Sequence, residues 1–132
     1  MDTAQQVSNP PIVEIKGIEN LDETCLYRGQ TYKTTDLFEL SKGLDMFEVP
    51  LAFINLGSMP WSEIQDVEDV LKHTKRIIDA DLSYPIIISP TGGILNGFHR
   101  VCKSILDGET SIKAVKLDKM PAPMEVLINT EE

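Results

Sequence analysis

The chain has 132 residues, which suits one ordinary domain and is too short for two. With 42% hydrophobic residues it can bury a core, so the composition excludes a disordered or collagen-like chain. Twelve basic and 21 acidic residues give a net charge of −9, which disfavours binding to nucleic acid or to a membrane surface, since both need clustered positive charge.

The sequence contains no apolar run near the roughly 20 residues of a membrane helix, and residues 1–8 lack the pattern of a signal peptide. We therefore expect a cytoplasmic protein without a membrane partner. Cys25 and Cys102 lie far apart without the spacing of metal ligands, which predicts two free thiols and no structural metal site. The expected organisation is a lead-in over 1–11, one domain over 12–120 and an acidic tail over 121–132.

The first third of the chain gives weak structural signals. The run Ile-Val-Glu-Ile at residues 12–15 predicts a short strand, whereas residues 17–35 show only a turn signal at Arg28–Gly29. Thr35 or Asp36 can cap a short helix that ends at Gly43. The next two elements are better defined.

Residues 50–55 form an apolar run closed by Gly57 and Pro60, which predicts a buried strand, because so short a helix could not offset its nucleation cost. Ser62 and Gln65 then have the spacing of a capping box, so a helix is expected to begin there. Its apolar residues recur at helical spacing and form one stripe: Val67, Val70, Leu71, Thr74, Ile77 and Ile78.

The second half alternates strands and a helix. Residues 84–89 hold three consecutive isoleucines and predict a buried strand, which a turn over 90–93 connects to a returning strand at 94–95. A helix begins near Gly97 or Phe98 and ends at 107–108, and the alternating residues 111–117 predict a half-buried strand.

The joint between the returning strand and this helix carries the clearest chemistry. A helix that begins after Gly97 exposes unpaired N–H groups and a partial positive charge, and glycine allows a ligand to approach the main chain. His99 and Arg100 in the first turn oppose the helix dipole unless an anion is present, and Lys103 adds a third cation nearby. The pattern outlines an anion site. An ordinary strand-to-helix joint with solvated basic residues stays open as the alternative.

Residues 85–88, the motif Gly93-Ile-Leu-Asn-Gly-Phe-His-Arg100 and residues 103–108 resemble the core of the ParB N-terminal/sulfiredoxin-like superfamily. Its small members share a Pro-Ile-Ile strand, a turn, an Asp-Gly-x-His-Arg motif and a helix. Residues 73–82 also resemble a stretch common in such proteins, so the likeness spans about 62–117. The resemblance implies an α/β fold, with a mixed α+β sheet, in a single ParB/sulfiredoxin-like domain.

The resemblance also implies a nucleotide ligand, ATP or CTP with Mg²⁺, whose phosphates lie at the start of the helix. Two functions follow: a nucleotide-dependent phosphotransferase or NTPase that acts on a small-molecule acceptor, or a non-catalytic binding or interaction module. DNA binding and nuclease activity are disfavoured, and a homodimer is left open. His99 is the expected catalytic residue. The expected phosphate-binding residues are Asn96, Gly97, Phe98, His99, Arg100 and Lys103.

The chain departs from the family in three ways. Sulfiredoxin has its reactive cysteine where this chain has Phe98, so reduction of sulfinic acid is not expected. Too few residues follow the match for the helix-turn-helix domain of ParB proteins. Asn96 replaces the motif aspartate and cannot act as a base, which favours the non-catalytic function, whereas the intact Gly-x-His-Arg favours the enzyme. No motif fixes a general base, and Glu48 and Glu63 are candidates outside the expected site.

Other residues permit two interpretations each. His73 and Arg76 share one face of the predicted helix and are either solvated or at the edge of a substrate site. Asp79 and Asp81 flank the end of that helix, as loop caps or as a metal ligand or base. Trp61 is the only tryptophan and serves as a core anchor or as a stacking platform for a base.

Overall fold

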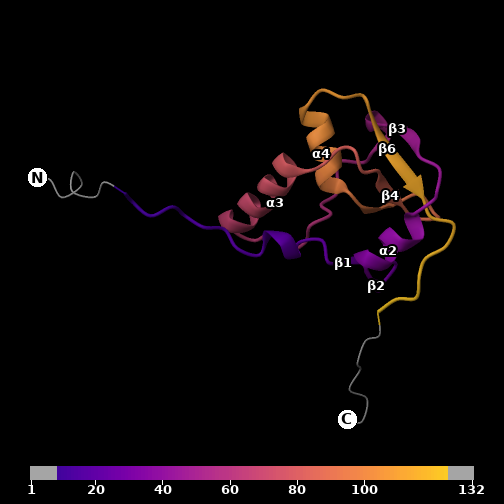
Figure 1. Ribbon diagram of the computed structural model, residues 1–132, viewed down its shortest axis with the longest axis horizontal. Coiled ribbons are helices and arrows are strands. Elements are labelled where there is room, and N and C mark those ends of the chain that lie inside the picture. The colour runs from indigo at the N-terminus through magenta and orange to yellow at the C-terminus, as the bar shows by residue number, and fades with distance from the viewer. Residues whose placement is uncertain (1–8, 125–132) are drawn as a thin grey trace, which may run out of the picture.

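A four-stranded sheet forms the centre of the molecule in the computed structural model, which describes residues 9–124 (Figure 1). The strand order is β3 (Phe47–Pro50), β6 (Ser111–Lys116), β4 (Ile86–Ile88) and β5 (Ile94–Asn96). Strand β6 pairs in parallel with β4 and antiparallel with β3, and β4 pairs antiparallel with β5. The two inner strands therefore have a neighbour on each side.

The core lies on both faces of this sheet because successive side chains of a strand point to opposite sides. On one face Ile87 and Val115 pack with Leu37. On the other face Ile86 and Ala114 pack with other buried apolar side chains. The strands predicted over 84–89 and 111–117 are confirmed, and the three isoleucines are all buried, as expected for an inner strand covered on both sides.

A smaller sheet precedes the central one. Strands β1 (Thr24–Tyr27) and β2 (Gln30–Lys33) form an antiparallel hairpin. The predicted turn at Arg28–Gly29 is confirmed, and both residues have positive φ, 52° and 79°, as tight hairpin turns of type I′ require. Helix α2 (Thr34–Ser41) follows directly, which confirms the short helix predicted before Gly43.

Two predicted strands are wrong. Residues 12–15 form no strand: segment 9–17 runs away from the rest of the molecule (Figure 1), and Ile12 and Val13 are 88% and 84% exposed. A strand needs a partner for its N–H and C=O groups, and this segment has none among the described residues. The apolar run 50–55 is a single 3₁₀ turn, η2 (Leu51–Phe53), after β3 has ended at Pro50.

Helix α3 (Val67–Asp79) begins four residues later than the capping box at Ser62 predicts, since its N-cap is Asp66. Asp66 is the N-cap, and its Oδ1 accepts a hydrogen bond from the Asp69 backbone N–H at 2.8 Å. The predicted apolar stripe is largely exposed, with Val67 at 74%, whereas the one buried residue of α3 is His73. The side of α3 that faces the protein is therefore polar, and its hydrogen-bond partners explain why.

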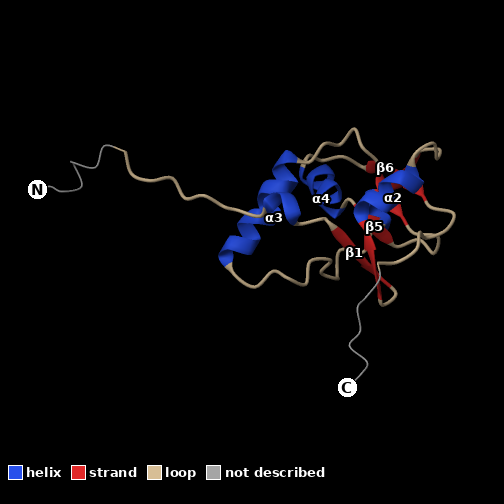
Figure 2. Ribbon diagram, turned by 60° about the horizontal axis from the view of Figure 1, so that its bottom comes forward, coloured by secondary structure: helices blue, strands red, loops and turns tan. Residues whose placement is uncertain are grey.

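Helix α4 (Phe98–Leu106) confirms the prediction of a helix from Gly97 or Phe98 to residues 107–108. It contacts α3, β4 and β6, and Figure 2 shows α3 and α4 beside each other at one end of the molecule. Strand β4, the turn, strand β5 and α4 thus follow in the predicted order. None of the helices within residues 9–124 is both long and apolar enough to span a membrane. Residues 9–124 form a mixed α+β domain with two sheets and three α-helices.

Candidate functional site

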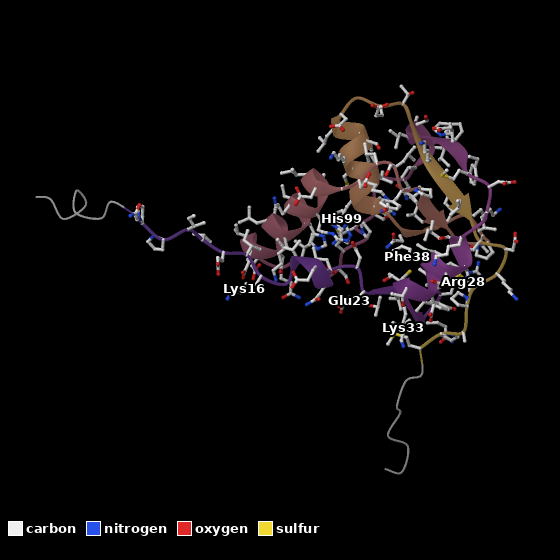
Figure 3. All side chains as sticks on the ribbon, in the orientation of Figure 1. Lys16, Glu23, Arg28, Lys33, Phe38 and His99 are labelled. Atoms are coloured by element: carbon white, nitrogen blue, oxygen red, sulfur yellow. The ribbon has the colours of Figure 1, made fainter. Side chains whose placement is uncertain are left out.

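A cavity of about 570 Å³ opens where α3, α4 and the segment before β1 meet. It brings together most residues of the predicted site: Asn96, Gly97, His99, Arg100 and Arg76 all line it. Figure 3 shows His99 inside the molecule, among the segments that surround this cavity. Three segments far apart in the sequence therefore build one site.

A chain of polar contacts runs through the wall of this cavity. Glu63 Oε2 lies 2.7 Å from His73 Nε2, and His73 Nδ1 lies 2.9 Å from His99 Nε2. His99 Nδ1 in turn lies 3.2 Å from Asp22 Oδ2, which also accepts a hydrogen bond from Arg76 Nη2. We call Glu63, His73, His99 and Asp22 the relay. Both imidazoles are almost fully buried, at 3% and 5% exposure.

Trp61 covers the two imidazoles of the relay. Its ring centroid lies 4.5 Å from that of His99 at an interplanar angle of 14°, and 4.6 Å from that of His73. Phe98 completes the group edge-on to Trp61, with centroids 6.2 Å apart. Trp61 is thus engaged with histidines, and this packing shields the two imidazoles from water. Aromatic stacking of this kind also fixes the ring orientations that the hydrogen bonds need.

Asp22 is the acidic end of the relay inside the cavity. Burial alone would raise the pKa of its carboxyl, but the hydrogen bond and charge of His99 and the charge of Arg76 outweigh burial. The pKa of Asp22 therefore lies below its ordinary value of 3.8. The carboxylate stays ionised and can accept hydrogen bonds across the physiological pH range.

Arg100 is held at the base of the cavity by two hydrogen bonds. Its Nη2 donates to the Pro85 carbonyl at 3.1 Å and to Asn96 Oδ1 at 3.0 Å. Its Nε is buried and has no hydrogen-bond partner among residues 9–124. Burial lowers the pKa of Arg100 below its ordinary value, and Arg76 adds to the decrease, although Asp22 and Asp81 oppose it. A buried donor without a partner lowers the stability of the folded protein by about 1–3 kcal/mol, so binding of an acceptor to this atom would be favourable.

Gly97 is glycine here for reasons of packing. Its φ is +113°, and a Cβ at this position would lie 2.6 Å from Ile86 Cγ2. Ile86 therefore fills the side of Gly97 where a Cβ would lie, and Gly97 still lines the cavity. As N-cap of α4, Gly97 provides no side chain for the first N–H groups of that helix.

The remaining predicted residues lie outside the cavity. Phe98 lines neighbouring hollows instead. Lys103 Nζ donates to the carbonyls of Ile78 and Ala80 at 2.9 Å and 3.0 Å, so it caps the C-terminal end of α3. His73 lies behind His99 and does not line this cavity.

The candidate bases and metal ligands are placed differently from one another. Glu63 joins the relay, whereas Glu48 accepts a hydrogen bond from Ser111 on the edge of the sheet. Asp79 and Asp81 line the cavity. Within residues 9–124 no three His, Cys, Asp or Glu side chains gather as a metal site.

Sequence reasoning missed Asp22 entirely, because the stretch 17–35 carries no readable pattern. The pairing of His73 with His99, 26 residues away, was also missed. One signal could have shown it: His73 lies on the face of α3 opposite to exposed Val67, Leu71 and Ile78, where only a partnered polar group is tolerated.

Comparison of the chain with models of known protein families, with curated proteins and with solved structures finds no match.

Proposed function

We propose that the chain is a small nucleotide-binding protein with a ParB/sulfiredoxin-like domain, and that its cavity holds the phosphates of the nucleotide. The observation that carries this proposal is the buried Nε of Arg100, a donor without a partner in the described part of the chain, next to the uncapped start of α4. A phosphate oxygen satisfies such donors, and the helix dipole favours its charge. Arg76 supplies further positive charge in the same cavity, which His99 also lines.

The acidic residues of the cavity bear on how a nucleotide would be held. Asp22 is already engaged by Arg76 and His99, so it adds little repulsion. Asp79 and Asp81 lie on the rim, and Mg²⁺ bound with phosphates needs only one or two carboxylates. These two residues therefore fit Mg²⁺ as the companion of a nucleotide, where it would offset phosphate charge.

Catalysis would make the protein a phosphotransferase or an NTPase that acts on a small molecule, with His99 beside the phosphates. The alternative is a non-catalytic module, and one observation favours it. Asn96 Oδ1 accepts from Arg100, so the residue at the position of the family aspartate positions an arginine instead of activating an acceptor.

Thermal-shift titration tests the binding proposal. Purified protein is titrated with ATP, CTP, GTP and ADP, each with and without Mg²⁺. A nucleotide at about 100 times its Kd stabilises the fold by roughly 2.7 kcal/mol, a rise in Tm on the order of 10 °C. The same titration is run on Arg100→Ala, on Arg76→Gln, and on Lys119→Ala, which removes a charge from an exposed loop.

We expect one nucleotide to raise Tm in the wild type and in Lys119→Ala, with the rise lost in the two cavity variants. Far-UV circular dichroism confirms that each variant is folded, and Arg76→Gln keeps the test valid if Arg100→Ala does not fold. No shift with any nucleotide contradicts the proposal. If a nucleotide binds but neither phosphate is released nor a phosphorylated product forms, the protein is the non-catalytic alternative.

A further inference from the structure

The contacts of the relay fix how many protons its two imidazoles hold. A carboxylate can only accept hydrogen bonds, so His73 Nε2 must carry a proton toward Glu63, and His99 Nδ1 must carry one toward Asp22. Two neutral rings have two protons in all, and both are then used. His73 Nδ1 and His99 Nε2 would face each other as two lone pairs 2.9 Å apart, which is repulsive.

The opposite extreme is excluded in the same way. If both rings were imidazolium, two N–H groups would point at each other across the same 2.9 Å. Only three protons on the four ring nitrogens satisfy every contact, with the third proton between the two rings. The pair then carries one positive charge between the two carboxylates.

We propose that His73 and His99 share this third proton at neutral pH, so that the pair carries one positive charge between Glu63 and Asp22. This inference rests on the described contacts alone and does not require that a nucleotide binds. It assigns Glu63 and His73 as positioning residues, because they set the charge and the tautomer of His99 from behind the cavity wall.

The charges around the pair agree with one positive charge. Glu63 faces it from the loop before α3, Asp22 from the segment before β1, Arg76 from α3 and Arg100 from α4. Arg76 pairs with Asp22, and the charge of Asp81 opposes that of Arg100, so the proton shared by the rings offsets the charge of Glu63. Stacked Trp61 adds the face of its ring, which attracts a cation.

The two ends of the relay open to different surroundings. Asp22 lines the large cavity, whereas Glu63 is 51% exposed and lines a second hollow of about 530 Å³. The shared charge therefore lies between a carboxylate beside the cavity and one that faces solvent. A change at either carboxylate alters the charge that His99 presents at the cavity wall.

Long-range ¹H–¹⁵N spectra of protein labelled in the histidine rings test the proton count. The chain has only two histidines, so four ring nitrogens account for the whole signal. At pH 7 we expect three of the four nitrogens to carry a proton, the third proton being divided between His73 Nδ1 and His99 Nε2. Two fully unprotonated nitrogens in the wild type would show that both rings are neutral and would overturn the inference.

Two variants test whether the proton belongs to the whole relay. Glu63→Gln removes the charge at one end and Asp22→Asn removes it at the other, and each keeps a hydrogen-bond acceptor. We expect each change to lower the equilibrium constant for binding of the third proton by the histidine pair about tenfold, since each removes a charge-assisted bond. Glu109→Gln, at an exposed turn, is the matched control and should leave the spectra unchanged.

If each variant alters only the ring that it touches, the proton is not shared, because a proton held by one ring alone would not respond to changes at both ends. A merely structural role of Glu63 also predicts no change in the signals of His99.

Discussion

At the scale of single residues, Gly97 links the candidate site to the core. Its Cβ position is taken by Ile86, a buried residue of β4, so the start of α4 rests directly on the sheet. The positive φ of Gly97 sets the direction in which α4 leaves β5. The positions of His99 and Arg100, in the first turn of that helix, follow from this one conformation.

Gly97→Ala should therefore destabilise the protein by roughly 2–5 kcal/mol, because backbone strain and overpacking against Ile86 add together. Gly108→Ala is the matched control: Gly108 has a φ of +81° but no atom within 4 Å of the added Cβ, so only strain of about 1 kcal/mol applies. Urea unfolding measures both. Equal losses in the two variants would show that the contact with Ile86 is relieved without cost.

At the scale of elements, α3 is held to the protein mainly through polar contacts. Its outer face keeps Val67 and Ile78 exposed, its N-terminus is capped by Asp66, and its last carbonyls are bonded by Lys103 from α4. His73 is its one buried side chain. The helix thus depends on specific hydrogen bonds where most helices depend on an apolar stripe.

Lys103→Met keeps the aliphatic stem of the side chain and removes its two hydrogen bonds to the end of α3. We expect a loss of about 1–2 kcal/mol, because the ammonium group also interacts favourably with the dipole of α3. Lys75→Met, which removes the exposed pair with Asp79, should cost no more than about 0.5 kcal/mol. Hydrogen exchange of the α3 amides measures the effect locally, and unchanged protection in Lys103→Met would contradict this role.

The elements that the sequence predicted well are those with a strong local pattern. The local apolar pattern of Ile86–Ile88 and of residues 111–117 is enough to predict their burial, and Gly97 marks the start of α4. The stripe on α3 misled because burial of a helix face depends on partners elsewhere, here Glu63 and His99. The strand predicted over residues 12–15 is wrong for a related reason, since an apolar pattern does not ensure that a neighbouring strand is present.

At the scale of the whole molecule, the cavity exists only because three distant segments meet. The sequence predicted the segment around His99 and Arg100 and pointed to Arg76, since these are basic residues at a helix start or on a helix face. It could not predict that Asp22 lies between Arg76 and His99, because nothing in the sequence near Asp22 indicates a contact 54 residues away. The ParB/sulfiredoxin-like fold and the nucleotide stay predictions.

Asp22 couples these segments in a way that depends on pH. Its pKa is lower in the folded protein than the ordinary 3.8, so its stabilising contribution is complete well above that value and is lost as the pH falls through 3.8 toward the folded value. Asp22→Asn should cost about 1–3 kcal/mol at pH 7, since it weakens bonds to Arg76 and His99, and this cost should shrink steadily below pH 4.

Urea unfolding of the wild type and Asp22→Asn at pH 7, 5, 4 and 3 measures this difference. Asp118→Asn, an exposed position after β6, is the control and should follow the wild-type curve. A cost of Asp22→Asn that is the same at pH 3 as at pH 7 would show that the carboxylate charge contributes nothing.

The extended segment 9–17 has a mechanical consequence. It leads through Gly17, at a φ of +84°, straight into η1 (Ile18–Asn20), whose Ile18 lines the cavity. A force applied along segment 9–17 would therefore reach the cavity wall and Asp22 before it reached any strand of the central sheet. Tethering the protein to a surface by this end would load the wall of the site first, whereas a tether near Met124 would pull on the chain after β6.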